Sequence, residues 1–363
     1  MSELTQDSVN EAIKGYLEPH LEKDLVTAKA IKSIAIEGGK VKLAVELGFP
    51  AKGCMDDISA ALQEKVGALP GVERVEVEIS SNIVAHSVQK SLKPIDNIKN
   101  IIAVASGKGG VGKSTTAVNL ALALAEEGAK VGVLDADIYG PSQPRMLGIH
   151  GKPESKDGKT LEPMEGYGMQ AMSIGFLIDE ETPMIWRGPM VTQALEQLLN
   201  DTNWDGLDYL VVDLPPGTGD TQLTLAQKVP VSGAVIVTTP QDIALLDARK
   251  GLKMFEKVEV PVLGIVENMS IHICSKCGHE EHIFGQGGGS SMAAQYNVDL
   301  LGALPLDIRI REETDGGKPT VVAEPEARIS QIYREIARKT AAKLSLQAKD
   351  YAAKFPNIVI QNN

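Results

Sequence analysis

The sequence predicts an α/β protein in which a doubly wound, mostly parallel sheet follows a small α+β domain. From residue 101 onward, short uninterrupted apolar runs alternate with stretches of helical character, as in strands buried on both faces of a parallel sheet. The first ninety residues instead alternate between apolar and polar side chains. Glycine is abundant (35 residues) and aromatic residues are scarce (4%), which suits such a fold. We expect a small domain over 1–90, a linker over 91–99 and a large domain over 100–363.

The small domain is predicted to contain two helices and three strands. Gly38 and Gly39 join two alternating runs, and this spacing predicts a β-hairpin. Pro94 interrupts the polar segment after the last strand, as expected of a linker. The expected helices span 6–17 and 56–66, and the expected strands span 32–37, 40–47 and 72–80.

The large domain is predicted to contain six buried strands. The carboxyl ends of such strands meet at one edge of the sheet, where ligands bind. A final helix is expected over 328–355, with an apolar face that packs on the sheet, and "PNIVIQ" after it resembles a strand. The six apolar runs cover 101–107, 130–137, 209–217, 233–240, 260–269 and 298–307.

A glycine-rich motif follows the first of these strands. The segment "GKGGVGKST" fits G-x-x-x-x-G-K-[ST] and lies between a strand and an apolar helix that ends before Gly128. Glycines let backbone N–H groups turn toward phosphate oxygens, and the helix N-terminus adds partial positive charge. Lys113 is expected to contact the β- and γ-phosphates, and the Ser114 hydroxyl to bind Mg²⁺. The expected nucleotide-binding residues are Gly107, Gly109, Gly110, Val111, Gly112, Lys113, Ser114 and Thr115.

Acidic residues end two further strands. "YLVVDLPPGTGD" places Asp213 at the end of an apolar strand, where a carboxylate reaches the Mg²⁺ of a bound nucleotide. "VLDAD" supplies Asp135 and Asp137 at the end of another strand. For each of them, a helix cap or turn residue is the alternative interpretation.

Composition excludes several classes of protein. The formal net charge of −12 argues against nucleic acid as the main ligand. No apolar run of 18 residues and no signal peptide are present, so we expect a cytoplasmic protein without a membrane partner. Three cysteines are an odd number and do not make a disulfide framework, so a C-x-x-C here is a metal or redox feature.

Cys274 and Cys277 form that C-x-x-C pair, and Cys54 is the third cysteine. A metal centre held by thiolates usually needs four ligands. The pair has four interpretations: no role, a thioredoxin-type redox pair, a zinc knuckle completed by His272, His279 or His282, or half of a site completed by a second copy. A two-fold dimer turns two cysteines into four, which favours an iron–sulfur cluster or zinc.

Ordered motifs between Asn100 and Glu324 resemble the Mrp/ApbC/Nbp group of P-loop iron–sulfur cluster carriers. They include "ASGKGGVGKST", "VLDADIYGPSQPRMLG", "VVDLPPGTGD", "TTPQDIALLDARKG", "ENMS", "CSKCG" and "FGQGGG". The resemblance implies a homodimer that binds ATP with Mg²⁺, hydrolyses it, and holds a [4Fe–4S] cluster between the Cys274 and Cys277 pairs of two copies. It also implies cluster-assembly scaffold proteins and apo iron–sulfur proteins as partners.

The same resemblance assigns roles to other residues. The loop is similar to the deviant Walker A signature of the MinD/ParA/nitrogenase-iron-protein class, in which a lysine placed like Lys108 contacts the partner subunit's nucleotide. The assignments that follow are Asp135 and Asp213 near Mg²⁺, Asp137 orienting the attacking water, Gly217 near the γ-phosphate, Asp220 in a switch loop and Asn268 against adenine.

Two other functions fit parts of the sequence. A MinD/ParA-like positioning ATPase shares the loop but needs a basic DNA surface or a terminal membrane helix. A nucleotide-switched zinc-binding adaptor would use the cysteines without cluster transfer. The first ninety residues resemble an iron–sulfur-assembly-type domain. Cys54 in "GFPAKGCMDD" is displaced from the position of that family's cysteine. We therefore expect Cys54 to serve as a small apolar residue at the start of a helix. The sequence assigns no role to Arg187 of "WRGPM".

Overall fold

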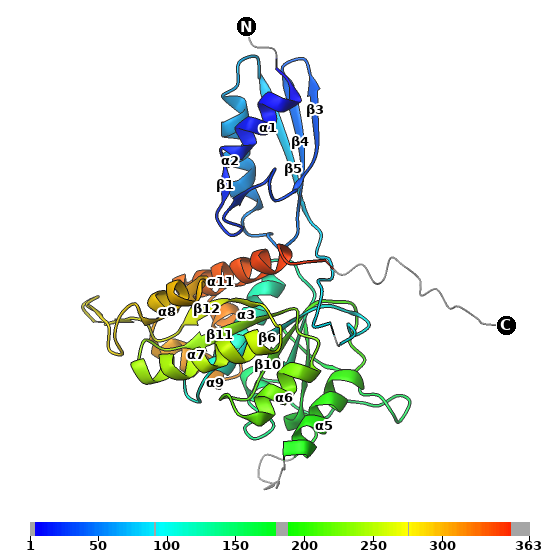
Figure 1. Ribbon diagram of the computed structural model, residues 1–363, viewed down its shortest axis with the longest axis vertical. Helices are drawn as coiled ribbons and strands as arrows, with labels where there is room; N and C mark the ends of the chain where they lie inside the picture. Colours follow the sequence, from blue (N-terminus) through cyan, green and yellow to red (C-terminus); the bar gives the residue numbers. More distant parts are fainter. Residues whose placement is uncertain (1–3, 91, 179–187, 275, 350–363) are drawn as a thin grey trace, which may run out of the picture.

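The structure is a computed structural model that describes residues 4–90, 92–178, 188–274 and 276–349. A small α+β domain precedes a large domain built on a mostly parallel sheet, as predicted. In Figure 1 the small domain stands next to helix α11, on one side of the large sheet. No helix in these described ranges is long and apolar enough to span a membrane.

The small domain has a three-stranded sheet in the order β3-β4-β5. The predicted hairpin is antiparallel, and β5 then pairs parallel with β4. The first helix ends at Lys14 rather than at residue 17, because the chain enters a short strand at Leu17. Its elements are α1 (Gln6–Lys14), β1 (Leu17–Glu18), β2 (Lys23–Asp24), β3 (Ile31–Glu37), β4 (Lys40–Leu47), α2 (Met55–Gly67) and β5 (Arg74–Ser81).

The large sheet has eight strands in the order β15-β12-β11-β6-β10-β7-β9-β8, and only the β8–β9 pairing is antiparallel. All six predicted strands are present, and β6 begins three residues earlier than the predicted strand. The sequence did not predict β8 and β9. The strands are β6 (Ile98–Ala105), β7 (Val131–Asp135), β8 (Met164–Gly166), β9 (Met169–Ser173), β10 (Leu207–Asp213), β11 (Gly233–Thr238), β12 (Val262–Glu267) and β15 (Leu300–Ala303).

Helices cover both faces of this sheet. Helix α3 packs against β6, β7 and β10, α7 packs against β11 and β12, and α11 returns to pack on α3. With the right-handed crossovers that parallel strands adopt, the strand order puts α3 on one face and α6 and α7 on the other. The last helix ends at Ser345 and not at residue 355, and "PNIVIQ" lies outside the described residues. The helices are α3 (Lys113–Glu126), α4 (Gln143–Met146), η1 (Ile174–Phe176), α5 (Gly188–Asn200), α6 (Asp220–Lys228), α7 (Asp242–Lys257), α8 (Gly288–Tyr296), α9 (Ile308–Asp315), α10 (Thr320–Ala323) and α11 (Arg328–Ser345).

A buried polar network joins the two domains at the C-terminal end of α3. Glu127, which caps α3, accepts a hydrogen bond from the backbone N–H of Gly53 at 2.8 Å and pairs with Arg338 of α11 at 2.5 Å. Glu335, one turn before Arg338, binds His20 Nε2 at 3.1 Å. Glu127 and Arg338 are buried together, so the small domain is fixed to the helix that follows the glycine-rich loop.

His20 carries the charge that makes this network depend on pH. Burial lowers the pKa of His20, but hydrogen bonds to Glu18 (2.6 Å) and Glu335 outweigh burial and raise the pKa to about 9. Because this is above the ordinary value of 6.5, the stabilisation is fully present below about pH 6.5 and is lost as the pH rises through about 9.

We therefore expect the free energy of unfolding of the parent to exceed that of His20→Gln by roughly 1–3 kcal/mol at pH 6, with the difference closing toward pH 9.5. Urea denaturation of both proteins across this range measures it. A difference that stays constant with pH would contradict the charged state assigned to His20.

Candidate functional site

The glycine-rich loop between β6 and α3 adopts a conformation that its glycines make accessible. Gly110 and Gly112 both have a φ of +81°, a region that residues with side chains rarely adopt. A side chain at Gly107 would overlap the backbone of Asp247 in α7. Two of the motif's glycines therefore serve backbone conformation and one serves packing.

A buried ion pair lies at the centre of the site. Lys113 opens α3 and is 6% exposed, and Asp213 ends β10 and is fully buried. Lys113 Nζ donates to Asp213 Oδ1 and, at 3.1 Å, to Ser114 Oγ. A buried ammonium needs an anionic partner. Phosphate oxygens carry the same charge as the carboxylate, so this loop and lysine fit a nucleotide.

Gln143 connects the ion pair to the loop, and the sequence analysis did not identify it. Its Nε2 donates to Asp213 Oδ2 at 2.9 Å and to the Ser114 carbonyl at 3.2 Å. Within the described residues its buried Oε1 has no hydrogen-bond partner. A hydrated Mg²⁺ beside Ser114 would satisfy such an oxygen, so the residues present fit the metal. The available signal was the "PSQPR" segment after "VLDAD".

Asp135 is a buried acceptor that organises the loop from β7 to α4. Its Oδ1 accepts the N–H of Asp137 at 3.1 Å, and its Oδ2 accepts the N–H groups of Ser142 (2.9 Å) and Gln143 (3.0 Å) and the hydroxyl of Ser173 (3.2 Å). Burial raises the pKa of Asp135. Four donors on one carboxylate indicate that Asp135 holds the loop in place.

Asp137 lies closer to solvent than Asp135. Burial raises the pKa of Asp137, and the Lys113 charge opposes that rise. The position near Lys113 is compatible with the expected orientation of a water molecule. Lys108, early in the loop, is half-buried, and its carbonyl accepts the Ser106 hydroxyl at 2.9 Å. Asp220 is exposed in the first turn of α6.

Two of the expected nucleotide contacts are bound to the loop itself. The Gly217 N–H, at a φ of +106°, donates to the Ser106 carbonyl at 2.9 Å. Asn268 Nδ2 donates to the Val111 carbonyl at 2.9 Å. To contact a nucleotide, either group would have to give up its hydrogen bond to the loop or share it with the nucleotide. Both groups are therefore placed to respond to changes in the loop.

Cys274 and Cys277 lie at the tip of a short hairpin formed by β13 (His272–Ile273) and β14 (Glu280–Glu281). The Cys274 N–H donates to the His279 carbonyl at 2.9 Å, which closes the turn. Backbone N–H groups of Lys276 and Cys277 lower the pKa of Cys274. Cys274 is half-buried and Cys277 is exposed, so the pair can reach a second molecule.

The expected histidines do not converge on this pair. No group of three or more His, Cys, Asp or Glu side chains in the described ranges is arranged to hold a metal ion. His272 Nδ1 lies 3.1 Å from the Leu306 carbonyl, and His282 Nδ1 lies 2.8 Å from the Ser270 carbonyl. Within the described ranges, His272 and His282 thus bind backbone carbonyls and do not complete a site with the cysteines.

Cys54 and Arg187 are the remaining residues that the sequence singles out. Cys54 is the buried cap residue of α2, and burial raises the pKa of its thiol to about 12. A thiol in this state remains protonated at neutral pH and is a poor metal ligand. Arg187 lies outside the described residues.

Comparisons with known proteins identify the family. A family model described as the NUBPL iron-transfer P-loop NTPase, of the ParA type, matches residues 97–341. The chain belongs to this family. A second model, described as an iron–sulfur cluster assembly protein, matches residues 6–79. The family predicted from the ordered motifs is therefore confirmed, and relatives of the chain are named iron–sulfur cluster carrier proteins.

Relatives from distant organisms share most of the chain. An iron–sulfur cluster carrier protein of Pseudomonas fragi is 61% identical over 278 residues, which cover 76% of this chain and 97% of that protein. Another from Escherichia coli K12 is 49% identical over 358 residues, 96% of this chain and 97% of that protein. The iron–sulfur cluster transfer protein NUBPL of Mus musculus is 46% identical over 313 residues, 86% of this chain and 95% of that protein. Family membership therefore covers both domains.

Solved structures share the fold of the large domain. A nucleotide-binding protein of Archaeoglobus fulgidus in complex with ADP is 40% identical with a TM-score of 0.57, covering 64% of this chain and 90% of that one. The cell division ATPase MinD of Pyrococcus furiosus is 23% identical with a TM-score of 0.51, covering 66% of this chain and 97% of that one. The MinD likeness shows the fold alone.

The buried Lys113–Asp213 pair predicts strongly non-additive mutations. Without nucleotide, Lys113→Met or Asp213→Asn alone should reduce the free energy of unfolding by about 3–5 kcal/mol, because each leaves an unpaired buried charge. The double variant should lose clearly less than the sum of the two. Urea denaturation of the four proteins gives the coupling energy, and additive losses would show that the pair does not interact in solution.

Proposed function

We propose that two copies of this chain hold a [4Fe–4S] cluster between their Cys274–Cys277 hairpins and deliver it to apo iron–sulfur proteins under the control of ATP. The observation that carries the proposal is the placement of the two thiols. They lie together at an exposed hairpin tip, and the described part of the chain brings no third ligand to them. A second copy supplies two more thiolates by symmetry.

The lowered pKa of Cys274 supports its role as a ligand, because the thiolate is the form that binds metal. Two exposed hydrophobic side chains, Ile273 and Ile283, flank the cysteine turn. Exposed apolar residues beside the thiols favour contact with another protein surface over permanent exposure to water. A second copy of this chain and then an apo acceptor protein would bind to this same hairpin tip, one after the other.

A short path of hydrogen bonds connects the nucleotide site to the hairpin. Asn268 binds the loop at Val111 and the strand end at Thr238, the latter through its N–H at 2.7 Å. Two residues later Ser270 donates its N–H to the Leu304 carbonyl at 2.9 Å and accepts from His282 at the far end of the hairpin. If a bound nucleotide rearranges the loop, the base of the hairpin would therefore move, and the affinity for the cluster would change.

ATP turnover in this proposal uses groups from both copies. Lys113, Ser114 and Asp213 hold the phosphates and Mg²⁺, and Asp137 orients the attacking water. Lys108 extends from the early part of the loop and reaches the nucleotide of the partner. Each nucleotide site is then complete only in the dimer. ATP hydrolysis and cluster transfer therefore both depend on the association of two copies.

The cluster ligands are tested by cysteine substitution. After anaerobic reconstitution, Cys274→Ser and Cys277→Ser should each lose at least roughly tenfold in bound iron and sulfide, with the visible absorbance, because each removes two of four thiolates from a dimer. Cys54→Ala is the matched control and should retain the parental content. Iron bound equally by all three variants would reject the assigned ligands.

The role of Lys108 is tested by complementation. Lys108→Ala and Lys113→Met should each be inactive in ATP turnover, whereas a co-expressed 1:1 mixture should recover about a quarter of the parental rate, because half of the dimers are mixed and each has one complete site. In a mixed dimer the Lys108→Ala copy keeps its own Lys113 and receives Lys108 from its partner.

The control is each variant mixed with itself at the same total concentration. A mixture no faster than the mean of the two single variants would place Lys108 in its own site and reject its action across the dimer.

A further inference from the structure

A cleft lies between the two domains, and none of its lining residues belongs to the glycine-rich loop. It has a volume of about 540 Å³ and is formed by the segment around β2, the ends of β4 and β5, and the end of α11. The two domains approach each other closely here. A Cβ atom at Gly48 of the small domain would lie only 3.0 Å from Ser345 Cβ in α11. In Figure 1 this region is where the red end of α11 meets the blue domain. The volume is typical of sites for small organic ligands.

The cleft is positively charged in a protein whose net charge is −12. Four of its lining residues are lysines and one is a glutamate, which pairs with one of the lysines. Lys23, Lys29 and Lys349 make no ion pair with any residue that the structure describes. Unpaired like charges collected at one place repel one another, and an anionic ligand would relieve that repulsion.

A buried histidine in the cleft wall has an unused nitrogen. His86 is 2% exposed, and its Nδ1 lies 2.9 Å from Asn100 Oδ1. Asn100 Nδ2 donates to the Val84 carbonyl at 3.0 Å, so Oδ1 is the acceptor and His86 Nδ1 carries the proton. His86 Nε2 is buried and has no partner among the described residues. A small movement of the cleft wall would let Nε2 and a phosphate oxygen share one proton, which would satisfy both atoms.

The floor of the cleft is apolar. Leu21, Leu47, Val84 and Leu346 contribute to its lining. Inorganic phosphate alone would leave this surface in contact with water, whereas the carbon skeleton of an organic phosphate would cover it. The combination of lysines, a buried imidazole and an apolar floor therefore favours an organic anion.

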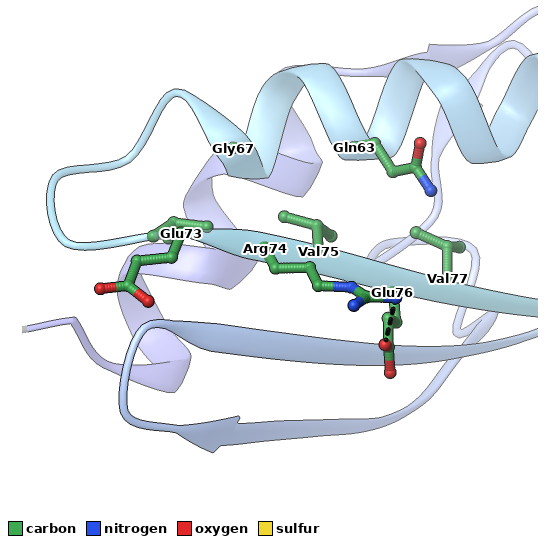
Figure 2. Close-up of a pocket in the computed structure, with 8 residues that line it drawn as sticks. Gln63, Gly67, Glu73, Arg74, Val75, Glu76 and Val77 are labelled. Atoms are coloured by element: carbon green, nitrogen blue, oxygen red, sulfur yellow. Dashed lines mark ion pairs between the residues drawn. The ribbon is translucent and has the colours of Figure 1, made fainter.

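A second cavity differs from the interdomain cleft because its described lining residues carry no unpaired positive charge. A cavity of about 570 Å³ lies along the edge strand β5 and the end of α2. Figure 2 shows that its Arg74 points to Glu76, and the two form an ion pair of 3.0 Å. Its single cationic lining residue is therefore already compensated, and its other charged residue, Glu73, is negative. This cavity thus does not call for an anionic ligand.

We propose that the interdomain cleft is a second ligand site, separate from the nucleotide site, that binds a small organic phosphate through Lys23, Lys29, Lys349 and His86. Both domains contribute to it, so bound ligand would favour the docked arrangement of the domains. This site does not depend on cluster binding or on dimer formation.

Phenyl phosphate is a suitable probe, because it joins a phosphate to an apolar ring. The full chain is first saturated with ADP and Mg²⁺ so that the glycine-rich loop is occupied, and the probe is then titrated in by calorimetry. Phenyl phosphate should bind more tightly than both inorganic phosphate and benzoate. If either of these binds as tightly, the assigned ligand class is overturned.

Two double variants locate the binding. Lys23→Gln with Lys349→Gln should weaken phenyl phosphate binding at least tenfold. Lys65→Gln with Lys159→Gln removes the same charge from exposed positions outside the cleft and should leave the dissociation constant within twofold of the parent. His86→Gln should also weaken binding. Absence of binding to the parent, or equal binding by the two double variants, overturns the proposal.

Discussion

A lysine ammonium that has been removed from water must have a negative partner, and the large domain is arranged around that requirement. Strand order places β10 beside β6, so Asp213 comes to lie opposite the start of α3, where Lys113 is buried. Gln143 then ties the carboxylate to the loop. An incoming phosphate competes with Asp213 for the same ammonium. The Lys113–Asp213 pair is therefore an interaction that the nucleotide can replace, and the carboxylate that it releases is beside Ser114, where Mg²⁺ would bind.

In the proposed coupling, that exchange would reach the cysteines through a few residues. The loop carbonyl of Val111 is bound by Asn268, and a side chain at Gly112 would overlap the Asn268 amide. The loop and the end of β12 are therefore in direct contact. Only a few residues separate Asn268 from Cys274, and their backbone is anchored at Ser270. A short, rigid connection transmits displacement better than a long flexible loop, so the proposed coupling between ATP and the cluster would act through this segment.

The sequence predicted the parts of this protein that depend on local pattern. Continuous apolar runs identified all six core strands, and the glycine spacing identified the loop and Lys113. The sequence did not identify β8 and β9, which are short and lie at the edge of the sheet, where burial leaves a weak pattern. It also did not identify Gln143 or the Glu127–Arg338 pair. Those contacts join residues that are 29 to 211 positions apart in the sequence, and a single sequence does not show which distant residues meet in the fold.

Helix α3 connects these regions. Its first residue is Lys113, and its cap is Glu127, so the helix is held by the nucleotide site at one end and by the small domain at the other. Ten of its 14 residues are buried, and a packed helix moves as a rigid body. A shift of the loop when a phosphate replaces Asp213 would therefore be felt at Gly53 and Arg338. The small domain is thus attached where it can sense, or bias, the state of the nucleotide, which gives a physical reason for its fusion to this ATPase.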